Sequence, residues 1–246
     1  MADCVGVDQA RIASASCLQV ATQKLGQAPA FWGRYFKDPG NTDSIQYQAG
    51  LESEFLNSKN IKVLPVGRQT DNVSQPDTAL GRQDGGNNAA AIIASFGAAT
   101  LAAMPGVAVF LDAEIDNALN HLYYQGWSEG LIAGGSDDGI KFVPCLYAHH
   151  NDGNTFSELG EAMAAGAVCG AAWIVFMDTG NFPIGPWQAK FVGKNMPAGL
   201  PVAITQRVLD FQDPQGRAYD FDLVNPAHQD WLLPRLILPP ASVPTV

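Results

Sequence analysis

Eight short apolar runs, separated by helical or irregular segments, most constrain the fold of this 246-residue chain. Most of them are rich in Val, Ile and Phe and lack strict polar alternation, which is typical of parallel strands covered on both faces. Eight strands alternating with helices predict an α/β fold, a single (β/α)8 TIM barrel over residues 1–246, with an irregular tail over 238–246. The runs occupy residues 4–8, 30–36, 61–69, 107–114, 141–149, 171–178, 201–208 and 219–224.

Candidate helices lie between these runs. Thr155 and Glu158 have the spacing of a capping box at the start of one of them. An open doubly wound sheet has similar content, but no run is followed by the Gly-rich loop of a dinucleotide site, so the sequence favours the barrel. The helices are expected at residues 14–25, 44–58, 87–104, 117–133, 156–168, 186–194 and 226–237.

The charge balance limits the partners. With 24 acidic against 14 basic residues the net charge is −10, and no cluster of Lys or Arg is present. Such a chain repels phosphate backbones, so we expect neither nucleic acid nor an anionic membrane as a partner. The uncharged stretch 89–111 is interrupted by Pro105 and Gly106, and we interpret it as a buried helix and strand rather than a membrane span.

The chain start and the cysteines are less informative. Asp3 follows Met1 closely without an apolar segment, so no signal peptide is expected. The protein then acts in the cytoplasm, leaves by another route, or has lost a leader; acting on cell walls would require the periplasm or the outside. The cysteines form no CxxC pair, and we expect buried free thiols.

The triplet Asp112-Ala113-Glu114 follows a buried strand, so both carboxylates project the same way. Paired carboxylates at this spacing suit acid/base cleavage of a glycosidic bond. We expect neighbouring carboxylates and partial burial to keep Glu114 protonated as the general acid, while Asp112 stays ionised and stabilises an oxocarbenium-like transition state. A solvated loop start is the alternative interpretation.

Polar residues recur at the ends of all eight runs. In a parallel barrel these ends share the rim where barrel enzymes carry their chemistry. Asp8 and Asp222 are therefore candidates to orient a sugar or act as base, or else are strand-end caps, and Asp220 shares the face of Asp222. The other candidate substrate-binding residues are Arg34, Gln69, Tyr147, His149, Asp178 and Gln206.

Other chemistries have less support. Trp32, Trp173 or Trp187 can stack on a sugar, although core packing is the more common role of a strand aromatic. His149 and His150 lack a third ligand at metal-site spacing, so we expect no metal and no cofactor. The chain has no G-x-S-x-G, P-loop or H-E-x-x-H motif.

Short motifs on these strands resemble family-25 glycoside hydrolases, the muramidase-type lysozymes. The resemblance is closer to a sister group, the glycoside hydrolase-like barrel domain named after a mycobacterial exported protein. The motifs are Gly6-Val7-Asp8, Leu111-Asp112-Ala113-Glu114, Pro144-Cys145-Leu146-Tyr147, Ala172-Trp173-Ile174, Thr205-Gln206 and Asp220-Phe221-Asp222-Leu223.

The resemblance implies that Glu114 is the proton donor, Asp112 the electrostatic stabiliser or nucleophile-positioning group, and Asp8 and Asp222 supporting carboxylates. The chain departs from the lysozymes at Gln206-Arg207, where Gln-Tyr is usual, and at Arg34. Residues 70–88, with Arg82 and Asp84, form an insertion that can roof the cleft.

Three functions remain open at this stage. The first is a hydrolase of peptidoglycan or a related bacterial polysaccharide. The second is a catalytically weak or inactive barrel that binds glycan or a protein partner in cell-wall regulation. The third is a phosphodiester hydrolase that holds Mg²⁺ or Ca²⁺ on rim carboxylates. The sequence favours the hydrolase and leaves the oligomeric state open.

Overall fold

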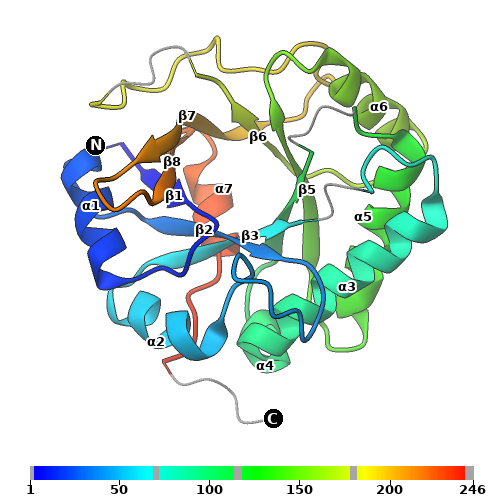
Figure 1. The fold of residues 1–246 in the computed structure, drawn as a ribbon. Helices are drawn as coiled ribbons and strands as arrows, with labels where there is room; N and C mark the ends of the chain where they lie inside the picture. The colour runs from blue at the N-terminus through cyan, green and yellow to red at the C-terminus, as the bar shows by residue number, and fades with distance from the viewer. Residues whose placement is uncertain (1–2, 69–71, 114–117, 178–181, 242–246) are drawn as a thin grey trace.

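A computed structural model describes residues 3–68, 72–113, 118–177 and 182–241, which form a closed eight-stranded barrel with helices around it (Figure 1). The strands follow one another around the barrel in sequence order. They are β1 (Val5–Asp8), β2 (Phe31–Phe36), β3 (Lys62–Gly67), β4 (Val107–Asp112), β5 (Phe142–His149), β6 (Ala172–Val175), β7 (Val202–Gln212) and β8 (Ala218–Val224).

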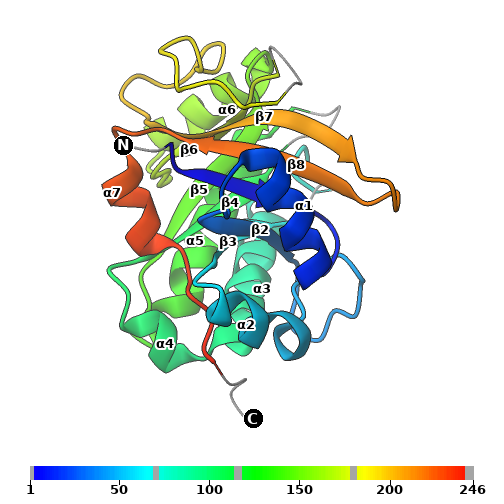
Figure 2. The ribbon, with the colours of Figure 1, turned by 90° about the vertical axis from the view of Figure 1, so that its left-hand side faces the viewer.

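Helices cover the outside of most of the wall. They are α1 (Ala15–Leu25), α2 (Ala49–Ser58), α3 (Thr78–Phe96), α4 (Ala98–Ala102), α5 (His121–Ser136) and α6 (Gly153–Ala164). The short α7 (Gln229–Leu232) and the 3-10 turn η1 (Leu233–Arg235) lie at one end of the barrel (Figure 2). None of the helices in the described residues is long and apolar enough to cross a bilayer.

The last strand departs from the predicted (β/α)8 pattern. Each pair of neighbouring strands from β1–β2 to β6–β7 is parallel, whereas β8 is antiparallel to both β7 and β1. Asp213 Oδ1 accepts the N–H groups of Gln215 and Arg217, and Gly216 has φ 68°, which closes a tight turn. So short a turn cannot carry a crossover helix, and the chain returns antiparallel. The fold is a mixed α/β closed barrel.

The prediction of a helix at residues 186–194 is wrong. Among the described residues between β6 and β7, none is helical. Gly185 and Gly193 lie at the two ends of this segment, and glycine disfavours a helix because it loses more backbone entropy on folding than other residues. Phe191 from this segment instead packs on Val5 and Leu223 against the outside of the barrel.

Helix α3 begins well before residue 87, where the sequence placed its start. The N-cap Asp77 accepts the N–H groups of Ala79 and Leu80. Gly85 faces α5 so closely that a Cβ would lie 2.2 Å from the Trp127 carbonyl oxygen. The glycines that lower helix propensity here are those that let α3 and α5 pack backbone to backbone. Most of the predicted insertion is therefore helix rather than a roof over the cleft.

A second helix start also differs. Asp152 is the N-cap of α6 and accepts the Thr155 N–H, so the helix begins at Gly153 and the capping box predicted from Thr155 and Glu158 is wrong. Thr155 Oγ1 donates to the same Asp152 carboxylate at 2.6 Å. The stretch 89–111 forms the end of α3, α4 and most of β4, so it is a helical segment followed by a strand, as expected. The four cysteines are free thiols, of which Cys17 and Cys145 are buried, whereas Cys4 and Cys169 are half-buried.

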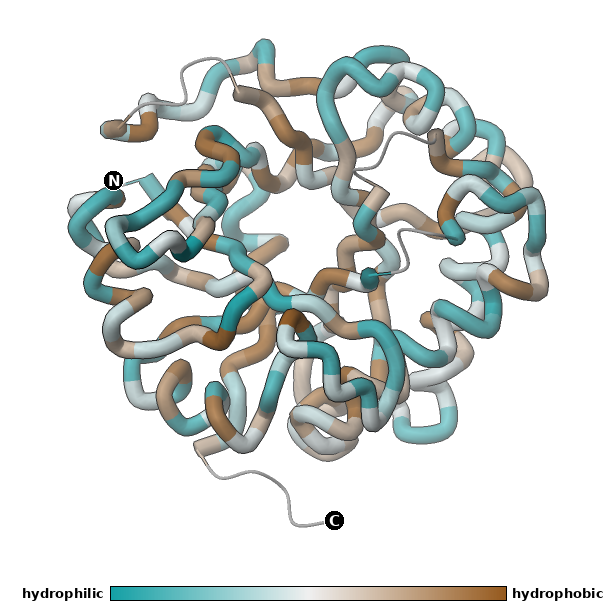
Figure 3. Tube along the Cα trace, viewed as in Figure 1, coloured by the Kyte–Doolittle hydropathy of each residue, from teal (hydrophilic) through white to brown (hydrophobic). Residues whose placement is uncertain are grey.

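Two apolar layers hold the barrel together. One lies between wall and helices, and includes Val109 and Leu111 with Trp127 of α5. The other fills the barrel, where Leu232 and Leu236 join interior side chains such as Phe31 and so close one end. Figure 3 shows the hydrophobic segments on the strands and the polar ones along outer helices and loops.

Candidate active site

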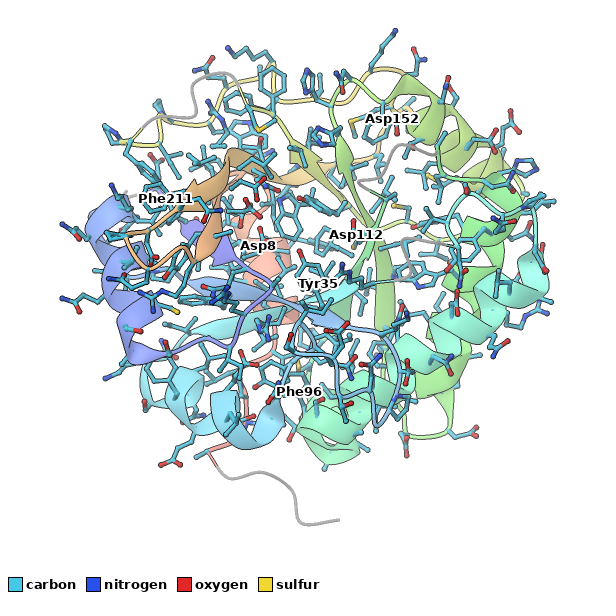
Figure 4. The ribbon with its side chains drawn as sticks, in the orientation of Figure 1. Asp8, Tyr35, Phe96, Asp112, Asp152 and Phe211 are labelled. Atoms are coloured by element: carbon cyan, nitrogen blue, oxygen red, sulfur yellow. The ribbon has the colours of Figure 1, made fainter. Side chains whose placement is uncertain are left out.

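The candidate site is built from side chains that alternate toward the inside of the barrel. On β4, Phe110 belongs to the interior cluster, and Asp112, two residues later, projects the same way. Asp8 likewise follows Gly6 on β1. Figure 4 shows Asp8, Tyr35 and Asp112 toward the middle of the barrel, while Phe96, Asp152 and Phe211 lie at its periphery.

Asp8 occupies its place because the neighbouring strand has a glycine beside it. Gly33 of β2 is the register partner of Asp8. A Cβ at Gly33 would lie 2.4 Å from Asp8 Cβ and 3.4 Å from the Trp173 ring. The absence of a side chain at residue 33 therefore makes room for the Asp8 carboxylate and the indole of Trp173.

The acidic residues of β8 lie beside β1, but β8 runs in the opposite direction from the one that the sequence suggested. Asp220 is paired with Asp8, and Asp222 is paired with Gly6 on one side and Gln206 on the other. Because β8 is antiparallel, these residues reach the rim from the start of their strand rather than from its end. Asp222 is buried, whereas Asp220 is half-buried and its Oδ1 accepts the Asp210 N–H.

Trp173 of β6 connects several of these side chains. Its Nε1 donates to Asp222 Oδ1 at 3.0 Å. Its ring lies 4.4 Å from the Tyr147 ring and meets Phe110 edge-on at 5.9 Å, measured between centroids. Of the three candidate tryptophans, Trp173 is the one inside the barrel; Trp32 is in the outer core and Trp187 packs on the outside.

Tyr147 and Gln206 form a second contact across the interior. The Tyr147 hydroxyl donates to Gln206 Oε1. Gln206 is fully buried, and its Nε2 has no hydrogen-bond partner among the described residues. A buried amide donor without a partner is costly, and a ligand hydroxyl or carbonyl would satisfy it.

Three carboxylates of this group are almost completely buried. The exposed fractions are 1% for Asp8, 7% for Asp112 and 0% for Asp222. Burying several carboxyl groups on one side of a barrel is expensive, and it is usual at sites that use them. The arrangement can bind a polyol and can hold or transfer protons close to it.

The remaining predicted residues are distributed as follows. Arg34 points outward and is fully buried, with its guanidinium on both Glu52 oxygens at 2.8 and 3.0 Å, so it is not brought together with the interior carboxylates. His149 ends β5 and is half-buried. Glu114, Gln69 and Asp178 lie outside the described residues.

The sequence did not single out Gly33 and Tyr35. Alternation from Gly33 also turns Tyr35 inward, and the Arg68 guanidinium lies 5.3 Å from the Tyr35 ring centroid. The charge of Arg34 drew attention to the wrong face of β2. Side chains alternate along β2, so once Gly33 is paired with Asp8, the inward-facing residues are Gly33 and Tyr35 rather than Arg34.

Metal-ligand atoms also gather away from the barrel interior. His121 of α5 and Glu158 and Glu161 of α6 have ligand-type atoms within 4.8 Å of one another. His121 Nδ1 lies 2.7 Å from Glu158 and 3.4 Å from Glu161, at half-exposed to exposed positions. The hydrogen bond from the His121 N–H to Glu158 gives this group a structural role in joining the two helices.

Comparison with known proteins supports the fold. No family model matches the chain, and no curated protein does. An uncharacterized B. stearothermophilus protein of known structure is 23% identical, with TM-score 0.64 over 95% of this chain and 99% of that one.

Two further solved structures share the barrel. The Mycobacterium tuberculosis Tat-secreted protein Rv2525c, in complex with L-tartrate, is 14% identical, with TM-score 0.54 over 92% of this chain and 98% of that one. The catalytic domain of endolysin ply40 from bacteriophage P40 of Listeria monocytogenes is 12% identical, with TM-score 0.52 over 95% and 98%. At these identities the likeness establishes a common fold.

Proposed function

We propose that the chain is a glycoside hydrolase-like barrel that cleaves a glycan of the bacterial cell wall by carboxylate acid/base catalysis. Glu114 is the proton donor, Asp112 the ionised partner, and Asp8 and Asp222 the supporting carboxylates. The observation that carries the proposal is the burial of Asp8, Asp112 and Asp222 inside one closed barrel. Carboxyl groups paired around a glycosidic bond are the usual machinery of its hydrolysis.

The surrounding side chains fit a sugar. Tyr147 and Gln206 offer hydroxyl and amide groups, and Trp173 and Tyr147 provide aromatic surface beside Asp222. The orphan Gln206 Nε2 is suited to a sugar hydroxyl or an N-acetyl carbonyl. The common fold with a phage endolysin catalytic domain and with a Tat-secreted mycobacterial protein is consistent with a cell-wall substrate.

The proposed mechanism assigns one proton transfer to each step. Glu114 gives its proton to the glycosidic oxygen as the bond to the sugar breaks, and Asp112 stabilises the positive charge that develops on the ring. Glu114 then takes a proton from the water that completes hydrolysis. Asp222, which accepts the hydrogen bond from Trp173, orients the sugar.

The test is release of reducing ends from purified peptidoglycan. Glu114→Gln should lower the rate by roughly 10²- to 10⁴-fold, as expected for loss of a general acid, and leave the thermal melt unchanged. Glu54→Gln, an exposed change on α2, is the matched control and should retain full activity. Undiminished turnover in Glu114→Gln would remove the proposed acid.

A binding measurement distinguishes the hydrolase from the alternative of an inactive glycan-binding barrel. Wild-type protein that binds peptidoglycan fragments in calorimetry but releases no reducing ends would support the glycan-binding alternative. Activity that survives thorough chelation would eliminate the third candidate, a phosphodiester hydrolase that depends on Mg²⁺ or Ca²⁺.

A further inference from the structure

Arg68 follows β3 directly and lies on the inner side of the barrel mouth. Leu64 and Val66 of β3 belong to the interior cluster. Because side chains alternate along a strand, Arg68, two residues after Val66, projects to the same side. Its N–H donates to the Phe36 carbonyl oxygen at 3.1 Å, so the pairing with β2 continues as far as this residue. Arg68 is therefore a cation at the rim that also carries the buried carboxylates.

The guanidinium of Arg68 lies over an aromatic ring. Its central carbon is 5.3 Å from the centroid of the Tyr35 ring, and Tyr35 packs against the interior cluster. Both side chains are half-buried, so solvent and ligands can reach them. Cation–π attraction holds a guanidinium without using its N–H donors. The donors of Arg68 are therefore available to an acceptor that enters the mouth.

Arg68 does not pair with the carboxylate on the next strand. Gly67 and Leu111 are register partners, and Arg68 and Asp112 follow them directly. No ion pair joins these two side chains, since the guanidinium lies over Tyr35 of β2, on the side of β3 that is away from Asp112. In the parts of the chain that the structure covers, its N–H groups donate to no side-chain or backbone oxygen.

Other arginines of this acidic chain have a carboxylate partner. Arg34 pairs with Glu52, Arg82 with Glu129 and Arg217 with Asp213. The chain has 24 acidic residues against 14 basic ones, so partners are plentiful. A half-buried arginine on the inner face without one is a feature that the carboxylate of a ligand would complete.

Gln206 is an independent sign that the interior of the barrel receives a ligand. Its side chain is fully buried, its Oε1 accepts the Tyr147 hydroxyl, and its Nε2 has no acceptor in the described ranges. Such a donor is costly unless a bound group satisfies it. Strands β3 and β7 are four places apart in the ring of eight, so a molecule that meets both Arg68 and Gln206 extends across the mouth.

The charges of the mouth give such a molecule a direction. Asp8 and Asp222 lie on the adjacent strands β1 and β8 and repel a negatively charged group. Arg68 attracts one on the β2 side of β3. A single guanidinium near buried carboxylates suits a monoanion better than a dianion, and a planar carboxylate can take two parallel N–H donors from it.

We propose that Arg68, held over Tyr35, is a substrate-binding residue that selects saccharides carrying a carboxylate close to the bond that is cleaved. This inference rests on the proposed function and deepens it, because it names a chemical property of the glycan. The guanidinium donates two N–H groups to the two carboxylate oxygens. Gln206 Nε2 donates to a neutral group of the saccharide at the opposite strand, and the two contacts together fix the direction in which the glycan lies.

The experiment compares two ligands that differ only in charge, by calorimetric titration of the folded full chain. The acid is N-acetylglucosaminyl-N-acetylmuramic acid with its free lactyl carboxylate, and the neutral ligand is its methyl ester. Wild-type protein should bind the acid roughly tenfold to 100-fold more tightly, as expected for one charge-assisted pair of hydrogen bonds. Arg68→Gln should lose this preference by weakening the acid alone. Arg68→Lys should keep part of it, because lysine retains the charge but not the planar fork.

Lys59→Gln, which removes an exposed positive charge at the end of α2, is the control and should bind both ligands like the wild type. Equal affinity of the wild type for acid and ester would overturn the role of Arg68 and leave the proposed hydrolysis intact, and this comparison does not depend on the folding of any variant. Equal weakening of both ligands in folded Arg68→Gln would also overturn it. Preference for the acid without release of reducing ends would support Arg68 and contradict the hydrolase, whereas binding of neither ligand would contradict both.

Discussion

The indole nitrogen of Trp173 lies 3.0 Å from Asp222 Oδ1 and joins β6 to β8 inside the barrel, past the intervening strand β7. The same ring contacts Tyr147 at 4.4 Å between centroids. One side chain thus fixes a buried carboxylate and an aromatic neighbour together. The orientation of Asp222 depends on a residue that the sequence presents as ordinary core.

Replacement of Trp173 by Phe should therefore have two effects. It keeps an aromatic ring but removes the donor to a buried carboxyl group, which costs about 1.5–3 kcal/mol of unfolding free energy. Any glycan hydrolysis should fall as well, because Asp222 loses its orientation. Urea denaturation and reducing-end release measure the two effects. Trp187→Phe, on the outside of the barrel, is the control, and equal losses in both variants would contradict this role.

Gly33 gives a steric prediction. A Cβ there would lie 2.4 Å from Asp8 Cβ, so Gly33→Ala must displace Asp8 and should destabilise the fold by about 1–3 kcal/mol. Gly50→Ala, on α2, is the control, because a Cβ at Gly50 would meet nothing within 4 Å and the change should stabilise by about 0.5–1 kcal/mol. Equal melting temperatures for wild type and Gly33→Ala would show that Asp8 is less tightly confined.

The Arg34–Glu52 pair is fully buried, and Glu52 also accepts the Ala13 N–H at 2.9 Å. Arg34→Met should destabilise by about 3–5 kcal/mol, because Glu52 would remain as an unpaired buried charge. The double variant Arg34→Met/Glu52→Leu should recover much of that loss in urea denaturation. Since Arg34 lies behind the wall, this folded double variant should bind glycan like the wild type. Weaker glycan binding by the double variant would instead support the substrate-binding role that the sequence predicted for Arg34.

Asp213 predicts a pH dependence. Burial opposes its ionisation, but hydrogen bonds from Arg217, Tyr219 and the Gln215 N–H outweigh it and lower the pKa of the carboxyl from 3.8 to about 2. A folded-state pKa below the unfolded value means that this contribution to stability is complete above the unfolded pKa and disappears as pH falls from about 4 to 2.

Thermal melts across this pH range test the effect. The difference in melting temperature between wild type and Asp213→Asn should be largest above pH 4 and should shrink toward pH 2. Asp138→Asn, at an exposed position, should show no such trend. If the difference in melting temperature between wild type and Asp213→Asn stayed constant with pH, the ionisation of Asp213 would not contribute to stability.

Much of the fold could be predicted from the sequence. Each of the eight apolar runs coincides with all or most of a strand, because a buried strand in an α/β fold needs a continuous apolar segment. Helix starts were less predictable. Gly81 and Gly85 argue against a helix by propensity, yet close contact with α5 compensates for their flexibility.

The candidate site was predictable only in part. Asp8, Asp112, Tyr147, Gln206 and Asp222 are brought to the interior, as alternation along strands predicts. Arg34 is not, since its strand turns Gly33 and Tyr35 inward instead. The direction of β8 also escaped prediction, because a turn of a few residues reverses a strand that composition alone cannot orient.

The sequence by itself determined where the strands lie and which residue types stand near their ends, because burial and side-chain alternation are local properties of the chain. The tertiary structure alone decided which ends face one another, which charges pair behind the wall, and that Trp173 reaches Asp222. Those relationships depend on register and strand direction, which are set by contacts between segments far apart in the chain.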